Sequence, residues 1–154
     1  MNISFCLIKI EILQFAVFHE NIVDGASNVA SEFQFGISPD MANMQCIGTF
    51  VFTNLDGDNI LKLQVACNFA VNSADIETLR QKDGTYKIPV GFLQHLAMIL
   101  VGTSRGILFA KTESNKVNKL YLPLINLTEV IKDDFIVKSN TDILESKVDR
   151  ANQQ

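Results

Sequence analysis

The sequence predicts an α+β fold with two layers, in which a four-stranded antiparallel sheet is packed by one long and one short C-terminal helix. Three patterns give this prediction. Apolar residues alternate with polar ones through much of the first half of the chain, as expected of strands. Helical spacing follows between Pro89 and Gly106, and a helix-start signal stands at Asn126.

The clearest local signal is a β-hairpin centred on Asp56-Gly57, between QCIGTFVFTN and ILKLQVACNFAV. Asp-Gly is a preferred two-residue hairpin turn because both positions tolerate positive φ. A slip of one residue would exchange the two faces of one strand, so the apolar pattern fixes the register. The facing pairs are then Phe52 with Leu61, Phe50 with Leu63, Gly48 with Val65, and Cys46 with Cys67. The facing cysteines permit a disulfide, but two reduced thiols are favoured in a cytoplasmic chain.

Two further strands are expected upstream, one within residues 3–18 and one at residues 32–38. In the second, Phe33, Phe35 and Ile37 alternate with polar or small residues. Residues 19–31 between them have the composition of a loop. After the hairpin, residues 72–87 are polar and connect the sheet to the helix.

The long helix is predicted from apolar residues at helical spacing after Pro89, which suits a first helical turn. These residues are Leu93, Leu96, Ala97, Leu100, Ile107 and Leu108. Glycine costs about 1 kcal/mol relative to alanine inside a helix. We therefore expect the helix to tighten or end near Gly106, with Lys111 and Thr112 beginning a loop.

The second helix is expected to begin after Asn126, a favourable N-cap, with Glu129 three residues on completing a capping-box pattern. Residues 139–154 are polar and form either a tail or a short amphipathic helix through Leu144, Val148 and Ala151. The expected organisation is one domain over residues 1–138, followed by that segment.

Composition narrows the class of function. Of the 154 residues, 47% are hydrophobic and only 19% are charged, so either the core is large or apolar surface is kept for a partner. The net charge of −4 disfavours nucleic-acid binding, which needs clustered Lys and Arg. The apolar N-terminus lacks a basic leader, and no run reaches the ~18 apolar residues of a membrane span. These features predict a cytoplasmic protein without membrane insertion.

Catalytic and cofactor sites are not indicated. The stretch VGTSRGILFAKT resembles a phosphate-binding loop, but Arg105 and Ala110 stand where that motif requires glycine. The cysteines and the two histidines, His19 and His95, show no metal-binding spacing, and no nucleophile stands beside a base. We therefore expect neither an enzyme nor a bound cofactor or metal.

The order of the elements, together with two short motifs, resembles the SecB family of export chaperones. Ser104-Arg105-Gly106 is similar to the Ser-Arg-Gly at the end of that family's long helix. Ile125 to Ile131, INLTEVI, is similar to its Val-Asn-Phe-x-x-Leu-Phe at the start of the last helix. The resemblance covers roughly Phe5 to Ile131. The family's proline lies two residues before the asparagine, whereas here Pro123 lies three before Asn126.

The resemblance implies an ATP-independent holdase that binds unfolded or export-destined polypeptides in apolar grooves. It also implies a homotetramer, built as a dimer of dimers with eight-stranded sheets packed through the long helices, and the SecA translocation motor as a partner. The family's acidic docking residues for SecA have no clear counterpart in this sequence. The alternative is an adaptor with the same fold that binds one specific partner, such as an antitoxin-type client.

Particular residues follow from this resemblance. The expected client-binding residues are Tyr86, Phe92, Ile107 and Phe109, which equally suit the core or an oligomer interface. The motif residues Ser104, Arg105, Gly106 and Asn126 are expected to be structural. Arg105 suits either the capping of helix carbonyls or an ion pair across an interface.

Overall fold

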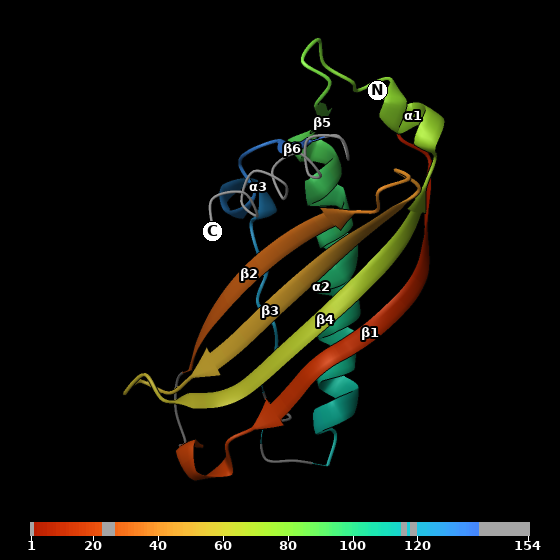
Figure 1. The fold of residues 1–154 in the computed structure, drawn as a ribbon. Helices are drawn as coiled ribbons and strands as arrows, with labels where there is room; N and C mark the ends of the chain where they lie inside the picture. The colour runs from red at the N-terminus through yellow and green to blue at the C-terminus, as the bar shows by residue number, and fades with distance from the viewer. Residues whose placement is uncertain (1, 23–26, 115–116, 118–119, 139–154) are drawn as a thin grey trace, which may run out of the picture.

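The structure is a computed structural model that describes residues 2–22, 27–114, 117 and 120–138 of the chain. It contains a four-stranded antiparallel sheet with one long helix lying across it (Figure 1). The α+β architecture predicted from the sequence is therefore confirmed. Residues 139–154, predicted as a tail or short helix, lie outside the described part of the chain.

The sheet has the strand order β1-β4-β3-β2, which is that of a Greek key. The strands are β1 (Phe5–Val17), β2 (Asn28–Ile37), β3 (Asn43–Thr53) and β4 (Asn59–Val71). Three consecutive strands form a meander, and β1 lies beside β4 rather than beside β2, so both β1 and β2 are edges (Figure 1). The predicted loop at residues 19–31 was too long, because β2 already begins at Asn28 and a 3-10 turn occupies His19–Asn21.

The register predicted for the hairpin is confirmed. Phe52 pairs with Leu61 and Cys46 with Cys67, and both cysteines are free thiols. The two-residue turn was wrong, because Thr53 pairs with Asn59 and, of Asp56 and Gly57, only Gly57 has a positive φ, of 87°. The Asn54 side chain explains the difference. Its Oδ1 accepts hydrogen bonds from the backbone N–H groups of Asp56 and Asp58, at 3.0 and 2.9 Å, and so closes a longer loop.

The long helix α2 spans Val90–Thr112 and runs across the sheet. It continues past Gly106, so the predicted end was wrong. Leu108 and Thr112 are buried, and the Thr112 hydroxyl donates to the carbonyl of Leu108 at 2.7 Å. Burial of these side chains outweighs the ~1 kcal/mol that a glycine costs.

The polar connection contains two elements that the sequence did not predict. Helix α1 covers Ser73–Glu77, and strand β5 (Tyr86–Ile88) pairs with β6 (Phe135–Val137) in a second, two-stranded sheet. Each is too short to show a periodic pattern. Helix α3 covers only Leu127–Val130 and begins where predicted. The capping-box contact was wrong, because the Asn126 side chain forms no cap and instead accepts a hydrogen bond from the Thr128 hydroxyl.

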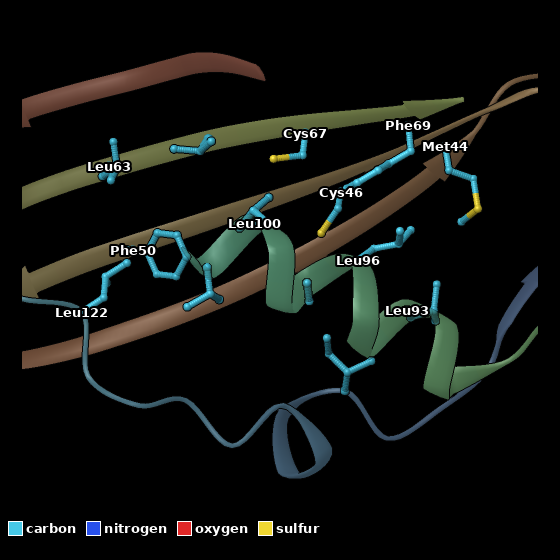
Figure 2. Close-up of a cluster of buried hydrophobic side chains, with 14 of the residues drawn as sticks. Met44, Cys46, Phe50, Leu63, Cys67, Phe69, Leu93, Leu96, Leu100 and Leu122 are labelled. Carbon is cyan, nitrogen blue, oxygen red and sulfur yellow. The ribbon is translucent and has the colours of Figure 1, made fainter. Parts of the chain in front are cut away.

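The core lies between the sheet and the inner face of α2. Figure 2 shows Leu93, Leu96 and Leu100 of the helix facing buried side chains of the central strands. Gly48 on β3 permits this approach, since a Cβ there would lie 2.3 Å from Cδ2 of Leu100. By length and apolar content α2 would also suffice to cross a membrane, a property that it shares with core helices of its length.

The close contact at Gly48 predicts opposite effects for two Gly→Ala substitutions. Gly48→Ala should lower the free energy of unfolding by about 1 to 3 kcal/mol, because Leu100 must leave its position in a close-packed core. Gly102→Ala should raise it by about 1 kcal/mol, because nothing lies within 4 Å of the added Cβ and alanine favours helix. Urea unfolding measures both. Equal effects of the two substitutions would contradict the packing described.

The burial of the three cysteines predicts how many thiols react in the folded protein. Cys6 is exposed, whereas burial, together with the neighbouring Cys67, raises the pKa of the Cys46 thiol to about 12. One thiol should therefore react with a disulfide reagent in the folded protein at pH 8, and three should react after denaturation. Because the folded thiol binds its proton more tightly, stability should fall as pH rises from 9 towards about 12. Equally fast reaction of all three thiols in the folded protein would refute this.

Candidate functional site

An open groove of about 650 Å³ lies between the outer side of α2 and the segment from Leu124 to Thr128. Apolar and neutral polar side chains make up most of its surface. Among the residues that the structure describes, no acidic residue lines it, and Arg105 is the one permanently charged residue in it. Its lining residues are Gly91, Gln94, His95, Met98, Val101, Gly102, Arg105, Leu124, Ile125, Asn126, Leu127 and Thr128.

The helical wall of the groove follows from residue spacing. Gly91, His95, Met98, Gly102 and Arg105 succeed one another at intervals of four and three residues and so lie along one side of α2. This side is turned away from the buried leucines. Met98 is 57% exposed, and nothing lies within 4 Å of a Cβ placed on either glycine. The helix therefore presents a shallow, accessible surface there.

The start of this helix is fixed from elsewhere in the chain. Pro89, at the N-cap position, forms no side-chain cap. Instead, Oδ1 of Asp134 accepts a hydrogen bond of 2.7 Å from the Val90 N–H, and Oδ2 of Asp134 lies 3.5 Å from Nζ of Lys87. A carboxylate satisfies a free N–H group at the positive end of the helix dipole. The two-stranded sheet and the helix start are thereby joined at one end of the groove.

The second wall is an extended segment held by side chains of α2. Pro123 disfavours helical backbone at Leu122, the residue before it. The buried Leu122 side chain anchors the segment to the core. Nε of Arg105 donates to the carbonyl of Leu122 at 3.2 Å, and Nη2 donates to the carbonyl of Pro123 at 3.0 Å. Arg105 thus binds loop carbonyls and not the helix carbonyls expected as one possibility from the sequence, and the ion pair across an interface stays a prediction. Leu124 is left 95% exposed at the rim.

A smaller hollow of about 480 Å³ adjoins the groove, and Gly91 and His95 line both. The Phe5 ring forms edge-to-face contacts with Phe92 and with His95, with ring centroids 5.4 Å apart in each pair. Ile3, Phe5, Pro89 and Phe92 make up most of the lining of this second hollow, so apolar surface continues from the groove past the N-terminal end of α2.

Apolar side chains also gather on the free edge strand β1. Five of them are between 40% and 56% exposed: Leu7, Ile8, Ile10, Ile12 and Leu13. The pairing with β4 shifts between Leu7 and Lys9 and again between Ile12 and Gln14, which leaves Ile8 and Leu13 without partners on β4. An exposed edge strand presents unpaired backbone N–H and C=O groups with which another strand can pair.

The four predicted client-binding residues do not meet at one place. Tyr86 is buried on β5, where its hydroxyl donates to Oε2 of Glu77 at 2.8 Å, and this hydrogen bond raises its pKa. Phe92 lines the smaller hollow, Ile107 is half-buried, and Phe109 is 49% exposed on α2. None of the four lines the larger groove, and their role in binding stays a prediction.

The motif residues have distinct positions. Arg105 and Asn126 both line the groove, although they are 21 positions apart in the chain. Ser104 is buried, and its hydroxyl has no hydrogen-bond partner within the described part of the chain. Gly106 is exposed, with open space where a Cβ would be.

Sequence reasoning missed Gln94, Met98 and Leu124 as groove residues. Met98 lies outside the apolar stripe of Leu93, Leu96 and Leu100, and this position is a usable signal of exposure. The sequence around Leu124 carries no signal of its exposure, because that exposure depends on how the Leu124–Thr128 segment packs against α2. Across residues 2–22, 27–114, 117 and 120–138, no group of three or more His, Cys, Asp or Glu side chains is placed to hold a metal ion.

Comparison with known proteins gives a similarity of structure and none of sequence. No family model matches the sequence, and no curated protein matches it. The fold resembles that of a SecB-like chaperone. That chaperone, from Mycobacterium tuberculosis, was solved in complex with a ChAD peptide from the HigA1 antitoxin. The TM-score is 0.47 at 10% sequence identity, and the match covers 79% of this chain and 91% of that one.

Proposed function

We propose that this chain is an ATP-independent chaperone of the SecB type, which binds extended apolar segments of unfolded polypeptides. The observation that carries the proposal is the open groove between α2 and Leu124–Thr128, with Met98 and Leu124 exposed at its surface. The order of the elements and the Ser104-Arg105-Gly106 motif support it through their resemblance to that family.

The chemistry of the groove suits many clients more than one folded partner. Apolar contacts are non-directional and increase with the area buried, so they accept segments of different sequence. The wall at Leu122–Leu124 has neither helix nor strand. The groove beside it is open without a ligand. Binding of a client needs no nucleotide, because the burial of apolar surface is itself favourable and no other step has to be driven by hydrolysis.

The wider role follows the same resemblance. We infer a cytoplasmic protein whose clients include export-destined polypeptides, with the SecA motor as the partner that would receive them. An adaptor that binds a single antitoxin-type client is the alternative. The two differ in promiscuity, which is measurable.

We further propose that two copies associate through their β1 edges to form an eight-stranded sheet, and that such dimers pair through α2. The exposed leucines and isoleucines of β1 lie at a free edge. A two-fold axis there would place the β1 edge of one copy against the β1 edge of the other. The Phe5–Phe92 contact and the Lys111 ammonium 5.9 Å from the Phe15 ring show which side of α2 faces β1. The groove lies where α2 meets the Leu124–Thr128 segment.

Client binding tests the proposed function. Several unrelated denatured proteins, diluted into buffer without ATP, should aggregate less in the presence of this protein. Leu124→Ser should raise the Kd for clients about tenfold, because roughly 1.4 kcal/mol of apolar contact is lost. Leu55→Ser is the matched control, since Leu55 is 71% exposed on the hairpin loop and away from the groove.

Two outcomes would contradict this account. One is that the protein binds a single folded partner and suppresses no aggregation. The other is that Leu124→Ser and Leu55→Ser bind clients with the same affinity.

Light scattering tests the assembly. The unaltered chain should have the mass of a tetramer at micromolar concentration. Ile10→Glu should reduce that mass, because it places a charge in the apolar β1 edge, whereas Ile136→Glu, at an equally exposed isoleucine of β6, should not. A monomeric unaltered chain at this concentration would exclude the proposed assembly.

A further inference from the structure

The groove has an unusual charge for this chain. The sequence holds 17 acidic and 13 basic residues, yet the described residues that line the groove include Arg105 and no acidic side chain. In the part of the chain that the structure describes, the ion pairs join Lys9 to Glu11, Arg80 to Glu77, and Lys87 to Asp134, and none of them includes Arg105. The guanidinium is half-buried, and no carboxylate among residues 2–22, 27–114, 117 and 120–138 forms an ion pair with it.

Arg105 also keeps donors free for a ligand. A guanidinium has five N–H groups, and the bonds to the carbonyls of Leu122 and Pro123 use two of them, which leaves three. These two bonds also hold the guanidinium in place, so little conformational entropy is lost when a further acceptor binds. Apolar side chains such as Met98 and Leu124 lie on the same groove surface and lower the local polarity.

A carboxylate is the group that complements such a cation. Hydrogen bonds between a guanidinium and a carboxylate are short and about twice as strong as those between neutral groups, and partial burial reduces their screening by salt. A cationic client residue at the same place would instead be repelled, and no acidic lining residue would offset the repulsion.

The groove length sets the size of the ligand. Gly91 and Arg105 both line it and are 14 positions apart on α2, which is about 21 Å at 1.5 Å per residue. An extended chain covers that distance with about six residues at 3.3 Å each. Arg105 stands at one end of this stretch and the apolar hollow at the other.

We propose that the groove selects extended client segments in which an acidic side chain stands among apolar residues, with Arg105 binding that carboxylate. This selectivity rests on the proposed function and names the class of client segment. The occupant is an unfolded chain, and the carboxylate is that of an internal Asp or Glu.

The test compares peptides on the unaltered protein. Three apolar peptides of equal length, acetylated and amidated so that they carry no terminal charge, differ only in a Glu, Gln or Lys at one internal position. We expect the Glu peptide to bind about tenfold more tightly than the Gln peptide, and the Lys peptide to bind most weakly. The preference for Glu over Gln should shrink as salt is added. Fluorescence anisotropy of labelled peptides measures each Kd.

Variants assign the preference to one residue. Arg105→Gln removes the charge and keeps side-chain N–H donors for the loop carbonyls, so the Glu and Gln peptides should bind it equally. Arg80→Gln, which removes an exposed arginine outside the groove, should keep the tenfold preference. Arg105→Gln could weaken the binding of every peptide by loosening the Leu122–Leu124 wall. In that case the ratio of the Kd values of the Gln and Glu peptides on the unaltered protein still tests the acidic preference.

The outcomes separate this inference from the function on which it rests. Equal binding of all three peptides to the unaltered protein would overturn the acidic preference and leave the chaperone proposal standing. Failure of every peptide to bind would overturn both. A preference that survives in Arg105→Gln would also refute the role of Arg105.

Discussion

The contact between Leu100 and the sheet at Gly48 is the constraint on which the rest of the molecule depends. A glycine in the middle of β3 leaves room for Leu100, so α2 settles close to the central strands (Figure 2). That contact fixes which side of the helix is buried. The remaining surface of α2 is then divided into a side that faces β1 and a side that faces the Leu124–Thr128 segment.

This division gives each side a separate task in the proposed function. On one side, the exposed β1 edge offers apolar surface for association between copies. On the other, the groove is walled by an extended segment that Arg105 holds through two backbone carbonyls. A helix with charged residues along its whole outer surface would not provide the apolar wall of this groove. The high hydrophobic content of the chain is therefore explained by the core together with these two exposed surfaces.

The sequence predicted what depends on local periodicity and missed what depends on distant contacts. The register of Cys46 opposite Cys67 followed from alternation, because a slip would place polar side chains in the core. The hairpin loop differed because the Asn54 side chain competes for backbone N–H groups, and α2 continued past Gly106 because Leu108 and Thr112 are buried. Arg105 and Asn126 were singled out as motif residues, but their meeting at one groove depends on the loop between them. Leu124 could not be assigned, since its exposure depends on which surfaces the fold leaves uncovered.

The central claim is that unfolded polypeptides occupy the groove between α2 and Leu124–Thr128. Site-specific photo-crosslinking tests it most directly, with the photoreactive residue placed at Met98 in one protein and at Leu55 in another, each mixed with a denatured client. The account predicts that Met98 crosslinks to the client and that an excess of competing apolar peptide abolishes the crosslink, while Leu55 gives none. Crosslinking from Leu55 as strong as that from Met98, or none from Met98 while the client is bound, would contradict it.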